Sequence, residues 1–167
     1  MNVKFEYGCV MAILGKNFAN EIVKFGNKLI PDDDLYFEEG QEYGREKEPH
    51  VTIKFGLTDN YSKEDMGKVI SHIKPFTITL VKIGIFNNEK FDVVKVDCES
   101  PTLRKLNKLF SKLPNEDEHK TYNPHLTLAY VLPGKGKKYI RSLSNPIEVN
   151  INRMKYSNPV GKYYYDL

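Results

Sequence analysis

One phrase of nine residues occurs twice in this chain, and it constrains the fold more than any other feature. The first copy reads PHVTIKFGL over residues 49–57, and the second reads PHLTLAYVL over residues 124–132, 75 residues later. In both copies apolar residues alternate with a histidine and a threonine, which is typical of a β-strand with one buried face. The chain has only four histidines, so two in this shared context predict two related halves built around the same kind of strand.

Strand geometry places the polar residues of each copy together. Side chains two positions apart point to the same face of a strand, so His50 lies beside Thr52 and His125 beside Thr127. The intervening side chains point the other way and are expected to pack against helices: Val51, Ile53 and Phe55 in the first copy, and Leu126, Leu128 and Tyr130 in the second. If the halves pair as two lobes, two imidazoles and two hydroxyls converge on one cleft.

Around these strands the chain alternates between strand-like and helix-like segments. Apolar periodicity predicts strands at residues 3–14, 50–57, 76–85, 91–97, 125–132 and 147–156, and helices at 17–29, 62–74, 101–113 and 135–143. This order predicts an α+β fold with one domain over residues 1–167. In it, two pseudo-symmetric lobes with antiparallel sheets form a concave cleft, and the helices pack outside.

Two imidazoles and two hydroxyls suit the cleavage of a phosphodiester bond. Histidine titrates near neutral pH, so one neutral imidazole accepts a proton while a second, protonated one donates a proton. Hydroxyl groups donate hydrogen bonds to the non-bridging phosphate oxygens without adding charge. This chemistry requires no metal or cofactor, and the sequence contains no evident cluster of metal ligands. Two questions stay open: which histidine is the base, and whether water or a ribose 2′-hydroxyl attacks.

The paired His-x-Thr strands resemble those of the 2H phosphoesterase superfamily, which includes RNA 2′,3′-cyclic phosphodiesterases of the LigT type. This resemblance implies that His50, Thr52, His125 and Thr127 form the catalytic set. Within the superfamily, the opening YGCVMA and the phrases EPHVTIKFGL and NPHLTLAYV are most similar to the phage anti-CBASS phosphodiesterase. The implied activity is hydrolysis of the 3′–5′ bonds of cyclic di- and trinucleotide messengers, which counteracts bacterial anti-phage immunity.

Two alternatives stay open at this point. The first is another reaction of the same superfamily, either the opening of 2′,3′-cyclic phosphates on RNA or the processing of RNA ends. The second is a non-catalytic module that binds and sequesters cyclic nucleotides. Intact histidines and threonines in both copies disfavour the second alternative, because a pure binder does not need an acid–base pair.

Four further residues are candidate substrate contacts. Tyr7 and Phe86 are aromatic side chains that can stack on a base, although core packing is equally consistent with Tyr7. Lys54 shares the predicted face of the first histidine and is placed to meet a phosphate. Glu148 is predicted on the concave side of the last strand, where it hydrogen-bonds a base, orients a histidine or is simply solvated. Three other residues are assigned to structure: His72 and His119 to the surface, and Tyr130 to the core.

Charge is unevenly distributed along the chain. Residues 31–49 carry eight acidic residues and two basic ones, whereas residues 132–167 carry seven Lys or Arg and two acidic residues. This asymmetry indicates either a solvated surface or a side that faces an anionic ligand. The acidic segment is also long enough to act as a lid that closes over a ligand. The net charge of +3 does not fit a dedicated duplex-DNA binder.

Several features predict a cytoplasmic protein without a membrane partner. No apolar run approaches the roughly 20 residues that a membrane-spanning helix needs, and the N-terminal residues lack the layout of a signal peptide. Cys9 and Cys98 lie far apart without metal-ligand spacing, so free thiols in a reducing compartment are expected. If a phage encodes the protein, the expected location is the cytoplasm of its bacterial host. The oligomeric state stays open.

Overall fold

The computed structural model describes residues 6–167, so the first three residues of the predicted strand 3–14 lie outside the described part. The strands are β1 (Gly8–Ile13), β2 (His50–Leu57), β3 (Phe76–Asn87), β4 (Asp92–Glu99), β5 (His125–Val131), β6 (Arg141–Ile151), β7 (Arg153–Ser157) and β8 (Lys162–Asp166). The helices are α1 (Lys16–Leu29), α2 (Lys63–Ile70) and α3 (Pro101–Phe110), with 3-10 turns η1 (Asp32–Asp34) and η2 (Gly136–Tyr139).

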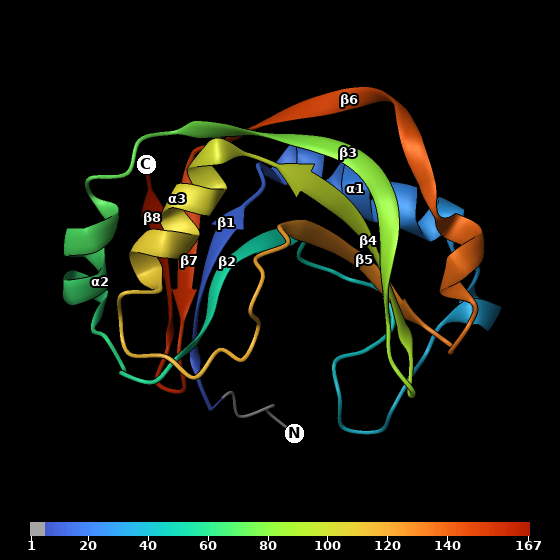
Figure 1. Ribbon diagram of the computed structural model, residues 1–167, viewed down its shortest axis with the longest axis horizontal. Helices are drawn as coiled ribbons and strands as arrows, with labels where there is room; N and C mark the ends of the chain where they lie inside the picture. Colours follow the sequence, from blue (N-terminus) through green and yellow to red (C-terminus); the bar gives the residue numbers. More distant parts are fainter. Residues whose placement is uncertain (1–5) are drawn as a thin grey trace.

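The two strands that carry the repeated phrase are neighbours at the centre of one eight-stranded antiparallel sheet, in the order β6-β3-β4-β5-β2-β1-β7-β8. They divide the sheet into a first half of β2, β1, β7 and β8 and a second half of β5, β4, β3 and β6. The halves meet through a single register pair, Val51 with Leu126, and together their strands form a strongly curved sheet (Figure 1). The predicted α+β fold is therefore confirmed, with the two lobes joined in one continuous sheet.

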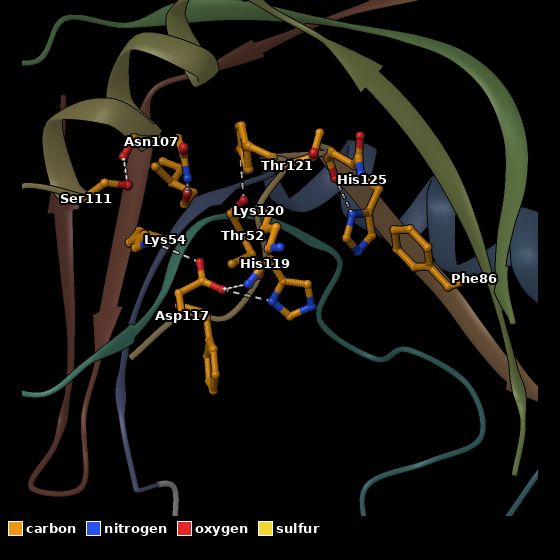
Figure 2. A pocket seen from close by; sticks show the side chains of 14 residues that line it. Thr52, Lys54, Phe86, Asn107, Ser111, Asp117, His119, Lys120, Thr121 and His125 are labelled. Atoms are coloured by element: carbon orange, nitrogen blue, oxygen red, sulfur yellow. Dashed lines mark hydrogen bonds and ion pairs between the residues drawn. The ribbon is translucent and has the colours of Figure 1, made fainter. Parts of the chain in front are cut away.

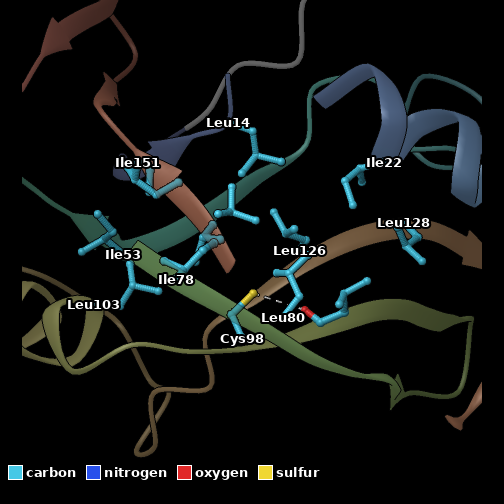
Figure 3. Packing of buried hydrophobic residues seen from close by; sticks show 14 of the residues in the cluster. Leu14, Ile22, Ile53, Ile78, Leu80, Cys98, Leu103, Leu126, Leu128 and Ile151 are labelled. Carbon is cyan, nitrogen blue, oxygen red and sulfur yellow. Dashed lines mark hydrogen bonds between the residues drawn. The ribbon is translucent and has the colours of Figure 1, made fainter. Parts of the chain in front are cut away.

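Two of the three helices, α2 and α3, begin at a serine that caps them with its side chain, whereas α1 has no side-chain cap. The hydroxyl of Ser100 accepts a hydrogen bond from the backbone N–H of Leu103, and Pro101 follows at the first helical position of α3. Ser62 caps α2 in the same way. Helix α1 packs on β5, and α3 packs on β2 and β3. The buried apolar residues of helices and sheet form a single core (Figure 3), in which the thiol of Cys98 lies 3.6 Å from the carbonyl oxygen of Val96.

The end of the chain differs from the prediction. The expected strand 147–156 is broken at Asn152 into β6, which pairs with β3, and β7, which pairs with β1 in the other half. The buried positions change phase at this break: Val149 and Ile151 are buried before it, and Met154 and Tyr156 after it. The expected helix 135–143 is only the short turn η2, because β6 begins at Arg141. The aromatic tail forms β8.

Both central strands contain a β-bulge at the same position of the repeated phrase. In β2, Thr52 pairs with Met11 and Lys54 pairs with Val10, so Ile53 is the extra residue. In β5 the extra residue is Leu128, since Thr127 pairs with Lys95 and Ala129 pairs with Val94. A bulge re-aims the side chains that follow it, and its recurrence shows that the two halves match even in their irregularities.

The bulges overturn three of the predicted side-chain directions. Lys54 pairs with Val10, on the face opposite to that of Met11, the partner of Thr52, so Lys54 does not share the face of His50 as predicted. Phe55 pairs with Cys9, and Tyr130 pairs with Val93. Paired residues of antiparallel strands share a face, so both aromatic rings lie on the face of the histidines rather than opposite to it. Phe55 accordingly remains 43% exposed. The prediction that Phe55 and Tyr130 pack under the sheet was wrong, because strict alternation holds only as far as each threonine.

Within residues 6–167, none of the helices is long and apolar enough to cross a membrane. Cys9 and Cys98 carry free thiols, as expected.

Candidate active site

The two histidines of the repeated phrase are held by the same local contact. Nδ1 of His50 lies 2.9 Å from the carbonyl oxygen of Glu48, and Nδ1 of His125 lies 2.7 Å from the carbonyl oxygen of Asn123. A carbonyl oxygen only accepts hydrogen bonds, so Nδ1 carries a proton in each ring, and the lone pair of a neutral ring lies on Nε2. This arrangement leaves each Nε2 available to accept a proton from a neutral ring or to donate one from a charged ring.

The surroundings of His125 combine an aromatic ring with an ion pair. The ring of Phe86 packs edge-on against the imidazole, with 4.9 Å between the ring centroids. The ammonium of Lys95 lies 4.3 Å from the centre of the Phe86 ring and pairs with Asp97, the register partner of His125. Burial lowers the pKa of His125, and the positive charges of Lys95 and His50 add to this effect. The Asn123 carbonyl and Asp97 oppose it without cancelling it, so His125 is predominantly neutral at neutral pH.

Two residues near the C-terminus, Lys155 and Tyr164, contact the side chain of Glu48, which lies next to His50. Nζ of Lys155 lies 3.2 Å from both carboxylate oxygens of Glu48, and the hydroxyl of Tyr164 donates to one of them at 3.2 Å. Burial would raise the pKa of Glu48, but the contacts of Lys155 and Tyr164 outweigh it and lower the pKa. Glu48 thus stays ionised while its backbone carbonyl orients His50.

Three lysines of the site are almost fully buried, and each has a carboxylate partner. Lys54, Lys95 and Lys155 are 7%, 5% and 6% exposed, and their partners are Asp117, Asp97 and Glu48. Buried lysines are rare unless they are paired. The sequence analysis missed Lys95 and Lys155, although each stands inside a strand between two apolar residues, which is an unusual setting for a lysine.

A cavity of about 600 Å³ opens between β2 and the loop that leads from α3 to β5 (Figure 2). Its walls combine aromatic, amide, hydroxyl and charged groups, contributed by Thr52, Ile53, Lys54, Phe55, Phe86, Asn107, Ser111, Asp117, His119, Lys120, Thr121, Tyr122, Asn123 and His125. The loop is tied to β2, because the hydroxyl of Tyr122 donates to the carbonyl of Thr52 at 2.9 Å. The cavity therefore lies beside His125 and reaches along the first His-x-Thr strand.

The structure brings some of the predicted contacts to this cavity and leaves others away from it. Phe86 lines it, and so does Lys54, whose ammonium is held by Asp117 at 2.9 Å. Tyr7 lies outside the lining, with its hydroxyl donating to Glu116 at 2.8 Å. Glu148 is exposed on β6, at the edge of the sheet opposite Thr79 in β3, and also lies outside the lining.

His119 is a residue of the cavity wall that the sequence analysis assigned only to the surface. Its ring is 82% exposed, and Nδ1 lies 2.8 Å from Oδ1 of Asp117, the carboxylate that also holds Lys54. Burial would raise the pKa of Asp117, but Lys54 and His119 outweigh it and lower the pKa. A histidine on a polar loop has no periodic signal, so only the packing of the loop against β2 reveals this placement.

The two charge blocks found in the sequence bind one another. Asp34 in the acidic segment pairs with Lys138 and Lys135 from the basic end of the chain, and Lys138 is the first cause of its lowered pKa. Segment 31–49 is also fastened along β5 and to the end of α1, where Arg45 donates to the carbonyl of Ile30 at 2.7 Å. Its longest exposed stretch is the tip, residues 37–42. These contacts are inconsistent with a lid in which the whole of segment 31–49 moves.

The comparisons with known proteins agree with this geometry. The family model of the 2′-5′ RNA ligase superfamily matches residues 32–156, a range that contains both His-x-Thr strands. A comparison with curated protein sequences gave no match.

Three solved structures illustrate the shared fold. E. coli LigT, determined with 3′-AMP, has a TM-score of 0.65 and 14% identity over 98% of this chain and 95% of that chain. Kluyveromyces marxianus Usb1 has a TM-score of 0.62 and 12% identity over 99% and 100% of the two chains. The TT0787 protein of Thermus thermophilus has a TM-score of 0.61 and 17% identity over 96% and 94%. Because the family model covers most of the chain and includes both histidine strands, the chain belongs to the 2′-5′ RNA ligase superfamily and is a 2H-type phosphodiesterase with the fold of LigT.

Proposed function

We propose that this protein cleaves the 3′–5′ bonds of cyclic di- and trinucleotide messengers without a metal ion, and that it thereby counteracts CBASS immunity in the bacterial cytoplasm. The observation that supports the chemistry is the matched anchoring of two imidazoles, each with Nδ1 on a backbone carbonyl and Nε2 on the other side of the ring. Each half supplies one histidine and one threonine, so the whole chain acts as one catalytic domain.

In the proposed reaction His125 is the base, because its lowered pKa keeps it neutral. Its Nε2 takes the proton of a ribose 2′-hydroxyl, and the 2′ oxygen attacks phosphorus. His50 donates a proton from Nε2 to the departing 5′ oxygen as the phosphorus–oxygen bond breaks. The products are a 2′,3′-cyclic phosphate and a 5′-hydroxyl. With water as the nucleophile, the same proton transfers yield a 3′-phosphate.

The threonine hydroxyls are assigned to the non-bridging phosphate oxygens. Thr52 and Thr127 occupy the same position relative to their histidines, one pair on each side of the junction between the halves. Their hydroxyls donate to the oxygens on which negative charge builds in the transition state. Lys95 is the register partner of Thr127, so a positive charge lies beside one of these hydroxyls.

The cavity beside His125 supports a nucleotide substrate. A volume of about 600 Å³ is within the usual range for small-molecule sites. Phe55, Phe86 and Tyr122 offer faces or edges for a base, and Asn107 and Ser111 offer hydrogen-bonding groups. Stacking on an aromatic side chain contributes roughly 1–3 kcal/mol per base.

A second candidate function is favoured by the relatives. LigT has been solved with 3′-AMP, and Usb1 with uridine monophosphate, so both of those proteins bind mononucleotides. The corresponding reaction here is the opening of a 2′,3′-cyclic phosphate at an RNA end, with water as the nucleophile and the 2′ oxygen as the leaving group. The same four residues would serve this reaction. A messenger-binding module without turnover is the remaining alternative.

The test is chromatography of cyclic di- and trinucleotides, and of an RNA with a 2′,3′-cyclic phosphate end, each incubated with the protein in excess EDTA. The comparison includes His50→Ala, His125→Ala and, as a matched control, His72→Ala, which replaces an exposed histidine outside the site. Cleavage by the wild type and the control, lost in both active-site variants, supports the proposal. Cleavage restricted to 2′,3′-cyclic phosphate RNA ends selects the second candidate, and binding without turnover selects the messenger-binding module.

A further inference from the structure

A second, smaller cavity adjoins the first one. Its volume is about 360 Å³, and it is lined by Val81, Lys82, Phe86, Lys95, Asp97, Cys98, Glu99, Arg104, Asn123 and Pro124. Phe86 and Asn123 line both cavities. Phe86 packs against the ring of His125, and the carbonyl of Asn123 anchors that ring. The two cavities therefore lie on either side of Phe86 and Asn123, the two residues that hold His125 in place.

The walls of the second cavity differ from those of the first in their chemistry. The first cavity offers several aromatic and amide groups, whereas Phe86 is the one aromatic residue that the described part of the chain contributes to the second. The second cavity has instead three basic side chains, on Lys82, Lys95 and Arg104, against two carboxylates. This lining is poorly suited to a base and well suited to a singly charged anion.

Two of the three basic side chains keep donors for a ligand. Lys95 is buried and committed to Asp97. Lys82 is 59% exposed, and its ammonium lies 3.8 Å from Asp97, beyond hydrogen-bond distance. Nη1 of Arg104 donates to the carbonyl of Tyr122 at 3.2 Å, which uses one of the five N–H donors of the guanidinium group. Lys82 and Arg104 approach the cavity from β3 and α3.

We infer that this second cavity binds a phosphate of the substrate other than the one that is cleaved, through Lys82 and Arg104. The inference rests on the proposed function and sharpens it: the preferred substrate carries at least two phosphodiesters, one at the histidines and one in the second cavity. A ring of two or three nucleotides meets this requirement, and so does a linear oligonucleotide. A dinucleoside monophosphate, whose single phosphate is the scissile one, does not.

The test compares Lys82→Ala with the wild type on three substrates: a cyclic dinucleotide, a linear trinucleotide with two phosphodiesters, and a dinucleoside monophosphate. Removal of one charged contact is expected to raise KM for the substrates with two phosphates about fivefold to tenfold. The expected change for the dinucleoside monophosphate is less than about twofold. kcat is expected to stay unchanged, because Lys82 does not touch the reacting atoms.

Two further variants extend the test. Arg104→Ala is expected to act like Lys82→Ala, but it also removes a contact to the loop at Tyr122, so Lys82→Ala carries the conclusion. Glu99→Gln removes a negative charge from the cavity and is expected to lower KM for the cyclic dinucleotide about twofold. Lys108→Ala, one turn along α3 from Arg104 and outside the lining, is the matched control and should leave every substrate unchanged.

Each outcome decides one question. An equal rise in KM for all three substrates, or no rise for any of them, overturns the second phosphate site. A rise for the linear trinucleotide alone identifies its ligand as an RNA phosphate and overturns the cyclic assignment. A wild-type protein that cleaves none of the three substrates refutes the proposed function itself, and that failure is seen before any variant is made.

Discussion

The two halves of the sheet are alike in the strands that carry the histidines and unlike in the strands beside them. In β2 and β5 the histidine is anchored by the carbonyl two residues before it, and a bulge follows the threonine. The neighbouring strand of the first half is apolar here, with Ile13 opposite His50. In the second half Asp97 takes that place opposite His125. The shared frame anchors the two imidazoles in the same way, but their surroundings differ: burial and Lys95 lower the pKa of His125, and Asp97 opposes them.

The loops that lead into the two histidine strands show the same relation. Segment 31–49 precedes β2 and is bridged to β5, whereas segment 111–124 precedes β5 and is bridged to β2. Beside β5, the rings of Tyr36, Tyr43, Phe91 and Tyr130 fill the space. Beside β2, the corresponding space is the cavity of about 600 Å³. The duplicated frame therefore has aromatic rings packed beside β5 and an open cavity beside β2.

The largest effect is expected from the histidines. His50→Ala and His125→Ala should each lower kcat/KM about 10³-fold, because each removes one of the two proton transfers. The double variant should lose little more than either single one, since the pair acts as a unit. Kinetics on the best substrate of the panel check this. If one variant keeps more than about a tenth of the activity, the two halves do not share one acid–base mechanism.

The next effect concerns the anchoring of the two loops. Lys54→Met removes the ammonium that pairs with the largely buried carboxylate of Asp117 and leaves it only the contacts of His119. This change is expected to lower the free energy of unfolding by about 3 kcal/mol. Asp32→Ala breaks the exposed ion pair with Arg45 in the other loop and should cost less than about 1 kcal/mol. Urea unfolding measures both. Adding Asp117→Leu to Lys54→Met should restore part of the lost free energy of unfolding. If Lys54→Met and Asp32→Ala lower the free energy of unfolding equally, the two loops are anchored equally and the comparison fails.

The threonines test whether the halves contribute equally to the transition state. Thr52→Val and Thr127→Val should each lower kcat about 10²-fold, because each removes a hydrogen-bond donor to the charged oxygens. KM should change little. Losses that differ strongly between the two variants would show that one hydroxyl carries the charge, and a rise in KM alone would assign both to substrate binding.

The smallest effect is a displacement of the pH profile. A base acts in its unprotonated form, and the pKa of His125 is lowered from 6.5, so the acid limb of kcat/KM should lie below pH 6.5. Lys95→Met removes a positive charge and leaves Asp97 beside the ring with only the more distant Lys82, 3.8 Å away. Both changes favour protonation of His125 and should move the limb to higher pH. The control is Lys112→Met, which replaces an exposed lysine outside the site and should leave the acid limb where it is. If Lys95→Met does not shift the acid limb of kcat/KM either, His125 is the acid rather than the base.

Much of the fold and the two His-x-Thr pairs of the site are predictable, because they depend on residues that are close together in the sequence. The helix caps, the strands of the repeated phrase and the meeting of the two halves follow from local pattern. Two of the substrate-contact predictions illustrate the limit. Phe86 lines the cavity, but Glu148 lies at the far edge of the sheet, because the strand that was expected to carry it breaks at Asn152 and changes halves.

The amino-acid sequence by itself determined the two His-x-Thr strands, and the proposed acid–base chemistry rests on them, since alternation along a strand is a property of the backbone alone. Only the tertiary structure decided what surrounds them. The bulges depend on the register of the partner strands. Lys95 and Lys155 reach the site because of the order of the strands in the sheet. His119 reaches it on the loop that leads from α3 to β5. These contacts join residues far apart in the chain, and a single sequence carries no local signal for them.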